Sequence, residues 1–271
     1  MSMRLSFSTC PNDTFIFHAM LHGKIDTEGL AFDVHLADVE ELNRAAFTGE
    51  AEVTKLSYAA YARVARKYSI LDSGSALGRG NGPLLVAKNL QKVTEETRVA
   101  IPGKYTTAAF LLQLVFPQLS RLTEALFSDI PQEILQGSVD AGVLIHESRF
   151  TYRQQGLHLI ADLGQEWEKR SGLPVPLGCI CVKTSMDSGL QQAFGRTLRR
   201  SVDYALQNPA ESRTFVRHYA RELSDEVIDR HIAMFVNRYT QSLGSEGRKA
   251  VSALFERVNG ALVTPQFVQG C

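Results

Sequence analysis

Three polar segments lie between a predicted strand and a predicted helix, and they carry side chains suited to binding an anion. The first is Ser-Thr-Cys-Pro-Asn-Asp-Thr at residues 8–14, directly after the predicted strand 3–7. Pro11 disfavours helix at the residue before it, and Asn12, Asp13 and Thr14 can all accept hydrogen bonds from free amides where a helix begins. Such a helix start suits an anionic ligand, although an ordinary helix cap is the simpler explanation for a single loop.

The second segment, residues 52–57, has the same position between predicted elements. Ser57 directly precedes the helical run that starts at Tyr58, and it is predicted to cap that helix with its hydroxyl. Lys55 adds a positive charge two residues earlier. The segment therefore combines hydrogen-bonding groups with a cation at a helix start, which favours a negatively charged ligand.

The third segment, Pro-Gly-Lys-Tyr at residues 102–105, follows the predicted strand 99–101. Thr106 and Thr107 come next and open a predicted helix with two hydroxyl groups. Ligands of open α/β sheets bind outside the carboxyl ends of the strands. Three such junctions in one chain therefore predict a shared site for a small anionic molecule.

His146 is the most suggestive ionisable residue. It directly follows the apolar run 141–145, which is typical of a buried parallel strand, so it stands at a strand's carboxyl end. The unperturbed pKa of histidine, about 6.5, suits proton transfer near neutral pH. Glu147, Ser148 and Arg149 follow at once and could orient the ring or bind substrate charge. The structural alternative is a histidine that only hydrogen-bonds a loop.

Other side chains are weaker candidates. His18 and His22 have a metal-compatible spacing on one predicted helix, but no third ligand is evident, so no metal site is predicted. His231 is expected to be structural or exposed, and Trp167, in a charged stretch, is expected to cover the edge of a lobe. Arg79, which stands between glycines, either reaches a carboxylate of the ligand or fills a turn.

Composition restricts the function classes. The chain has 271 residues, 44% of them apolar, and its 29 Lys and Arg balance 29 Asp and Glu. Zero net charge gives no general reason to bind nucleic acid, and no apolar run approaches the roughly 20 residues of a membrane span. The N-terminus shows no apolar leader, and the four cysteines show no zinc spacing. We therefore expect a cytoplasmic protein with reduced cysteines and no membrane insertion.

The order of predicted elements indicates two lobes. Strands and helices alternate, which is typical of an α/β protein. The first lobe is expected to be discontinuous, with residues 1–89 plus 176–271, the latter including four C-terminal helices, and the second lobe is expected over 90–175. Bilobal solute-binding folds are built in this way, with the ligand in an interlobe cleft that closes by a hinge.

Five segments together resemble the 1,4-dihydroxy-6-naphthoate synthase family, and they match it in order over nearly the whole chain. The segments are Ser-Thr-Cys-Pro-Asn-Asp-Thr-Phe-Ile-Phe (8–17), Thr-Lys-Leu-Ser-Tyr-Ala-Ala-Tyr (54–61), Ala-Leu-Gly-Arg-Gly-Asn-Gly-Pro (76–83), Pro-Gly-Lys-Tyr-Thr-Thr-Ala (102–108) and Ile-His-Glu-Ser-Arg-Phe-Thr-Tyr (145–152). The sister family, chorismate dehydratase, shares the fold but is not what the first and last of these segments look like.

The resemblance implies a lyase of the futalosine route to menaquinone, with a two-lobed fold like the type II periplasmic binding proteins. Such enzymes convert cyclic dehypoxanthinyl futalosine to 1,4-dihydroxy-6-naphthoate and release dihydroxyacetone, without a metal or organic cofactor. The implied partner is a small-molecule substrate. The sequence leaves the oligomeric state open, a homodimer included. The alternative of a different class is a non-catalytic solute-binding protein for an organic anion.

Residue roles follow from the resemblance position by position. His146 corresponds to the catalytic base. The positions implied to hold the substrate are Lys55, Leu56, Ser57, Thr106 and Thr107. Further candidates for substrate binding, taken from the polar loops themselves, are Asn12, Asp13 and Arg79.

Overall fold

The computed structural model describes residues 2–89, 92–260 and 264–269. Strands and helices alternate along this chain and form two separate sheets, which confirms the α/β class predicted from the sequence. None of the helices within these residues combines the length and the apolar character needed to cross a membrane.

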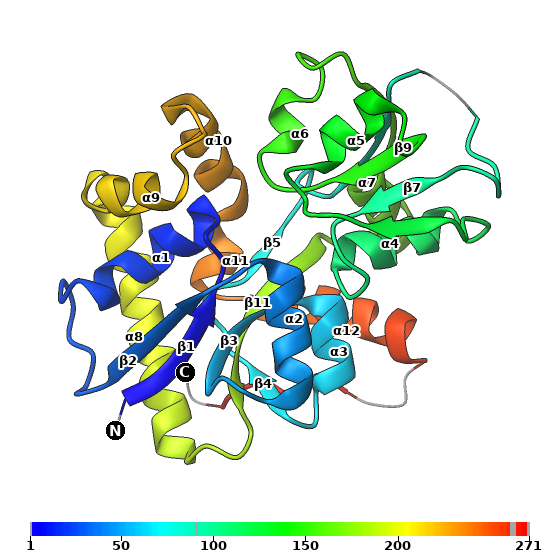
Figure 1. The fold of residues 1–271 in the computed structure, drawn as a ribbon. Coiled ribbons are helices and arrows are strands. Elements are labelled where there is room, and N and C mark those ends of the chain that lie inside the picture. The colour runs from blue at the N-terminus through cyan, green and yellow to red at the C-terminus, as the bar shows by residue number, and fades with distance from the viewer. Residues whose placement is uncertain (1, 90–91, 261–263, 270–271) are drawn as a thin grey trace. The chain divides into compact units, whose positions relative to one another are not determined.

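The described residues divide into two compact units (Figure 1). Unit 1 contains residues 1–77 and 176–271, and unit 2 contains Gly78–Val175. The first crossover is expected from the sequence at residue 89, whereas the structure divides after Leu77. The reason is strand β6 (Leu84–Ala87), which pairs with strands of unit 2 on both of its sides.

A mixed sheet forms the centre of unit 1. Its described strands are β1 (Ser2–Phe7), β2 (Ala31–Leu36), β3 (Val53–Ser57), β4 (Tyr68–Ile70), β5 (Ala76–Gly78) and β11 (Val175–Lys183). Their order is β2-β1-β3-β11-β4, with β5 paired to β11. β1 runs parallel to β2 and β3, whereas β11 runs antiparallel to β3 and β4. Strand β11, which follows unit 2 in the sequence, therefore lies between β3 and β4, which both precede unit 2 (Figure 1).

The helices of unit 1 pack on this sheet and on one another. They are α1 (Pro11–Leu21), α2 (Val39–Thr48), α3 (Tyr58–Val64), α8 (Ser188–Gln207), the 3-10 helix η1 (Pro209–Ser212), α9 (Arg213–Tyr219), α10 (Asp225–Phe235), α11 (Arg238–Gln241) and α12 (Gly244–Asn259). α1 lies against α8, where Ser201 Oγ donates to the Ile16 carbonyl (2.6 Å) and accepts from the Met20 amide (3.2 Å). Aromatic rings of β1 and α1, those of Phe7 and Phe17, stack in the core at 4.4 Å. This packing fixes the start of α1 over the sheet.

Unit 2 has a smaller sheet and its own core. Its strands are β6, β7 (Val99–Ile101), β8 (Leu122–Glu124), β9 (Ala141–Leu144) and β10 (His158–Asp162), in the order β10-β6-β9-β7-β8. Its described helices are α4 (Thr107–Val115), α5 (Ile130–Gln136), α6 (Ser148–Thr151) and α7 (Leu163–Ser171). Gly142 lets α5 approach β9 closely, because a Cβ there would lie 2.4 Å from the Ile130 side chain.

The strand register of unit 2 collects several loops at one edge. β6 is antiparallel to β9, with Leu84 opposite Leu144, so the residues before Leu84 lie beside those after Leu144. β7 is parallel to β9, so the chain that leaves β7 toward α4 emerges at the same edge. The segments around residues 81, 106 and 146 therefore share this edge.

Several elements differ from the sequence expectation. The first helix begins at Pro11, inside the polar segment 8–14 rather than after it, because proline is well suited to the first helical position. Trp167 does not cover an edge: it is fully buried on α7, and its indole donates to the Pro174 carbonyl (3.0 Å). The elements that the sequence analysis did not predict are β4, β5, β8, α6, α7 and α11.

Candidate functional site

In unit 1, the first two polar segments lie at neighbouring strand ends. β1 and β3 are parallel, with Leu5 opposite Val53 and Ser6 opposite Thr54, so their carboxyl ends meet at one edge of the sheet. The start of α1 follows β1 there, and β3 itself carries Lys55 and Ser57. The structure thus brings together the polar side chains of both segments.

Asp13 is the centre of a buried hydrogen-bond network in unit 1. Its Oδ2 accepts from the Ser8 hydroxyl (2.7 Å), and its Oδ1 accepts from Asn12 Nδ2 (2.7 Å) and from Lys55 Nζ (2.5 Å). The Asp13 side chain is fully buried, and that of Lys55 nearly so. Asn12 and Asp13 lie inside the first turn of α1 and do not cap it, although Asp13 Oδ2 does accept from the Ser8 amide just before the helix (3.4 Å), as the sequence leads us to expect.

His231 extends this network from the far end of the chain. It is fully buried on α10, and its Nε2 lies 2.9 Å from Asn12 Oδ1. Because the Asn12 amide nitrogen already faces Asp13, its oxygen must accept, and the bond fixes the proton of His231 on Nε2. Only the tertiary fold joins these residues, so no local signal in the sequence identifies His231 as part of the site.

Lys55 keeps hydrogen-bonding capacity beyond Asp13. An ammonium group has three N–H donors, and Asp13 Oδ1 accepts one of them. Gly178, opposite Ser57 on β11, makes room for the Lys55 side chain, because a Cβ at Gly178 would lie 2.9 Å from Lys55 Cε. Leu56, next to Lys55, points into the core and is fully buried, so only its backbone is suited to a ligand contact.

Ser57 differs from its predicted role. It occupies the N-cap position of α3, but its side chain makes no capping bond. Instead, its hydroxyl oxygen accepts from Asn43 Nδ2 (3.1 Å), and its amide donates to Asn43 Oδ1 (2.9 Å). Asn43 lies on α2 beside Leu42 on the buried face. A polar residue on such an apolar face is the sequence signal that would have identified Asn43.

In unit 2, Thr106 is a true helix cap. Its hydroxyl accepts from the Ala109 amide (3.1 Å) and donates to the Gly103 carbonyl (2.8 Å). Thr107 is the first residue of α4 and is buried. The first amides of a helix have no intrahelical acceptor, so the start of α4 is suited to an anion even though the Thr106 hydroxyl is already used.

His146 has an unusual backbone. It lies two residues after β9 with φ +53°, in the left-handed region that residues other than glycine rarely adopt. Its half-buried ring contacts the Phe127 ring edge-on, with 4.9 Å between centroids. Backbone strain of this kind is concentrated at functional sites, which makes His146 a candidate functional residue.

Arg149 and Arg79 both bind the protein itself. The half-buried Arg149 donates to the Gly80 carbonyl (2.9 Å) and lies 3.8 Å from Asp162; burial lowers the pKa of its guanidinium, and Asp162 opposes that effect. Arg79 donates to the Gly172 carbonyl at the end of α7 (3.0 Å). Substrate binding by Arg79 stays a prediction, and this contact also fits the alternative of a side chain that fills a turn.

His18 and His22, the pair with metal-compatible spacing, lie close together on α1. His18 and His22 stack at 4.4 Å, and His22 Nδ1 lies 2.9 Å from the His18 carbonyl. Burial, and then the neighbouring His22, lower the pKa of His18. The described part of the chain holds no group of three or more His, Cys, Asp and Glu residues placed to bind a metal ion.

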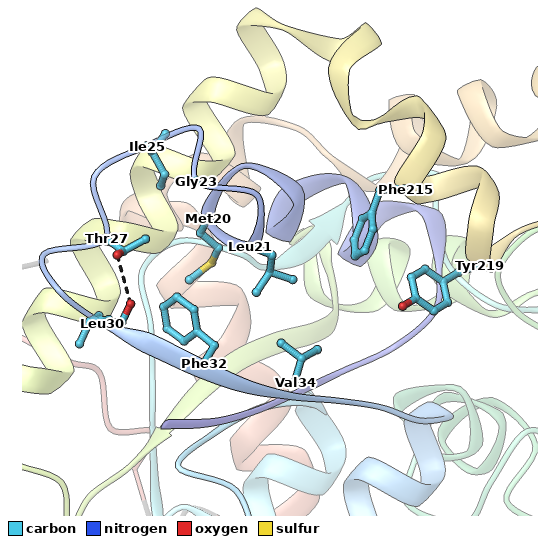
Figure 2. A pocket seen from close by; sticks show the side chains of 10 residues that line it. All are labelled: Met20, Leu21, Gly23, Ile25, Thr27, Leu30, Phe32, Val34, Phe215 and Tyr219. Atoms are coloured by element: carbon cyan, nitrogen blue, oxygen red, sulfur yellow. Dashed lines mark hydrogen bonds between the residues drawn. The ribbon is translucent and has the colours of Figure 1, made fainter. Parts of the chain in front are cut away.

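A pocket of about 430 Å³ lies elsewhere in unit 1 and contains none of the predicted site residues. Figure 2 shows apolar side chains of α1, β2 and α9 around it, among them Met20, Phe32 and Phe215. The Thr27 hydroxyl at its rim already donates to the Leu30 carbonyl (3.1 Å). The pocket therefore lacks the charged groups expected for an anion site.

The two-unit α/β architecture defines a protein of the periplasmic-binding-protein fold. A Candida albicans protein, CA3427, described as having the generic fold of this class, superposes with a TM-score of 0.70 at 11% identity, over 97% of this chain and 92% of its own. Protein AF1704 from Archaeoglobus fulgidus superposes with a TM-score of 0.91 at 37% identity, over 96% and 97%.

Within this class, the chain belongs to the menaquinone biosynthesis family, whose model matches residues 3–259. It is 48% identical to a 1,4-dihydroxy-6-naphthoate synthase from Thermus thermophilus, over 94% of this chain and 93% of the relative. It is 36% identical to a synthase of the same name from Streptomyces coelicolor, over 97% and 95%. The family expected from the five sequence segments is confirmed.

Proposed function

We propose that this chain is a carbon–carbon lyase that converts cyclic dehypoxanthinyl futalosine to 1,4-dihydroxy-6-naphthoate and dihydroxyacetone. The observation that carries the proposal is its near-complete alignment with two synthases of that name. The left-handed backbone of His146 supports it, because a strained residue at a strand end is typical of a functional position. The reaction is assigned to the cytoplasm, where buried cysteines such as Cys179 and Cys181 stay reduced.

In this proposal His146 is the general base. Cleavage of a carbon–carbon bond beside an oxygen function requires that a proton leave a hydroxyl or carbon of the substrate as the bond breaks. The imidazole accepts that proton, and hydrogen-bond donors stabilise the negative charge that develops on oxygen. The start of α4, which Thr106 caps and Thr107 opens, is suited to this second task, because the N-terminus of a helix favours negative charge.

The carboxylate of the substrate requires a cation or several donors. We assign it to Lys55, whose ammonium has more donors than Asp13 uses, and to Ser57, whose hydroxyl oxygen is oriented by Asn43. Leu56 contributes its backbone, and Thr106 supports the start of α4 from unit 2. Asn12 and Asp13 act in this proposal as positioning residues for Lys55 rather than as ligands.

The rival hypothesis is a solute-binding protein that captures an organic anion without changing it, because the fold class serves both roles. The purified protein should be incubated with cyclic dehypoxanthinyl futalosine, and with chorismate as the control compound. Appearance of the naphthoate absorbance and of dihydroxyacetone in equal amounts is the expected result. Recovery of unchanged ligand from the protein would support the solute-binding role instead, and conversion of chorismate would support the sister activity.

A further inference from the structure

Asn81 is a buried polar residue whose side chain lacks hydrogen bonds. Only 2% of its surface is exposed, and neither Nδ2 nor Oδ1 has a partner among the residues that the structure describes. Burying an amide without hydrogen bonds destabilises a protein, and native structures satisfy the great majority of such groups. A ligand that pairs with the amide would remove this cost.

The backbone on both sides of Asn81 is anchored, which restricts how far the residue can move toward another partner. The Gly80 amide donates to Glu168 (2.8 Å), and the Gly80 carbonyl accepts from Arg149 (2.9 Å). On the other side, Gly82 packs directly on Gly164, because a Cβ at Gly82 would lie 2.3 Å from the Gly164 Cα. Asn81 is therefore fixed between two anchored neighbours.

The position of Asn81 relates it to the proposed base. Leu84 of β6 pairs with Leu144 of β9 in an antiparallel register, so Asn81 and His146 lie at the same edge of the unit 2 sheet. Arg149, three residues after His146, reaches the carbonyl of Gly80, the neighbour of Asn81. The same contacts that hold the His146 segment thus also hold Asn81.

We propose that Asn81 is a further substrate-binding residue, and that its side-chain amide pairs with a hydroxyl group of the bound molecule. An amide both donates and accepts, which matches the donor and acceptor of a hydroxyl group better than it matches a carboxylate. The substrate class is therefore a hydroxylated small molecule, with its carboxylate bound elsewhere. This inference rests on the proposed function, because it takes the lyase substrate as the ligand.

The test compares wild type with Asn81→Leu, which replaces the amide by an apolar side chain of similar size. Without ligand, the melting temperature should stay the same or rise, because no unpaired polar group is buried. With the cyclic futalosine derivative, kcat/KM should fall roughly tenfold or more, and the ligand-induced rise in melting temperature should shrink. Asn81→Ala, which removes the amide without adding bulk, should show the same losses if the leucine variant does not fold.

Asn208→Leu serves as the control, because the Asn208 amide already donates to the Tyr204 carbonyl (3.0 Å) in unit 1. It should leave kcat/KM unchanged and should not raise the melting temperature. Unchanged kcat/KM and an unchanged ligand-induced shift in the Asn81 variants would overturn the inference. Wild type without turnover would instead overturn the proposed lyase, and a reduced ligand-induced shift in Asn81→Leu would then still support Asn81 as a ligand contact.

Discussion

Asp13 and Lys55 form a buried ion pair whose two members differ in what else they bind. Asp13 accepts from Ser8, Asn12 and Lys55, so protein donors occupy both of its oxygens. Lys55 gives Asp13 only one of its three N–H groups. The carboxylate therefore holds the ammonium in place while leaving donors for a ligand.

We predict that Lys55→Met destabilises the protein by about 3–5 kcal/mol, because it leaves the Asp13 carboxylate buried without its counter-ion. The double variant Asp13→Asn/Lys55→Met should recover most of that loss, because it buries no charge. Urea unfolding of the two single variants, the double variant and wild type measures the coupling. Strictly additive losses would show that the two side chains do not depend on each other.

His146→Asn should keep the fold but lose about 10²- to 10⁴-fold in kcat, the usual effect of removing a general base. Asparagine tolerates the left-handed backbone at this position better than most residues, so the strand end should not rearrange. Steady-state kinetics and thermal melting of the same preparations measure the two effects separately. His158→Asn, at an exposed position of β10 in the same unit, is the matched control and should retain full activity. Near-normal turnover in the His146 variant would remove it from the role of base.

The polar side chains of the loops were predictable from the sequence, but their hydrogen-bond partners often were not. Ser57 was expected to cap the helix that follows it. Instead, its hydroxyl accepts a hydrogen bond from Asn43 on another helix, and its amide donates one to the same residue. Capping rules describe local bonds, whereas this bond joins residues 14 positions apart. His231 is further still from Asn12 in sequence, so its contact depends entirely on how α10 packs.

At the scale of elements, the long strands and helices followed from periodicity, whereas of the three-residue strands only β7 was predicted. β4, β5 and β8 have three residues each, too few to show an alternating pattern. They exist because a neighbouring strand supplies hydrogen bonds, as β11 does for β4. α7 was not predicted because most of its residues are charged or polar, so its sequence does not indicate that Trp167 is buried. The Trp167 indole donates to the Pro174 carbonyl in the same unit.

The start of α4 offers a direct test of capping at a functional element. Thr106→Val should destabilise the protein by about 1 kcal/mol, because it removes the acceptor for the Ala109 amide. Thr106→Ser keeps that acceptor and should retain most of the stability. Denaturant midpoints of both variants measure the difference in stability. The value of kcat/KM shows whether a frayed helix start also weakens substrate binding. Equal stability of the two variants would show that the cap contributes little.

At the scale of the whole molecule, the alternation of elements predicted the α/β class, and the crossover of the chain predicted two units. The boundary near residue 78 was harder to place, because Leu84–Ala87 is apolar on all sides and would suit either sheet. Each unit has its own apolar core, around Phe7, Phe17 and Phe194 in unit 1 and around Val86 and Ile130 in unit 2. Which core a short buried strand joins is decided by packing over long sequence distances.

Acid should weaken the protein through carboxylates that arginines and lysines hold in their charged form. Glu28 is the clearest case: hydrogen bonds from Arg196 and Arg200 on α8 lower the pKa of its carboxyl from 4.5 to about 2. Because the pKa is lower in the folded state, this stabilisation is complete above about pH 4.5 and disappears as the pH falls toward 2.

Glu28→Gln should therefore lower the urea midpoint at pH 7, and its difference from wild type should shrink between pH 4.5 and pH 2. Urea titrations at half-unit pH steps measure this difference, and added salt should reduce it because the ion pairs are exposed to solvent. Glu222→Gln, at an exposed position of the same unit, is the matched control and should change the midpoint little at any pH. A Glu28 difference that stays constant down to pH 2 would show that the substitution acts through packing rather than through the charge of the carboxylate.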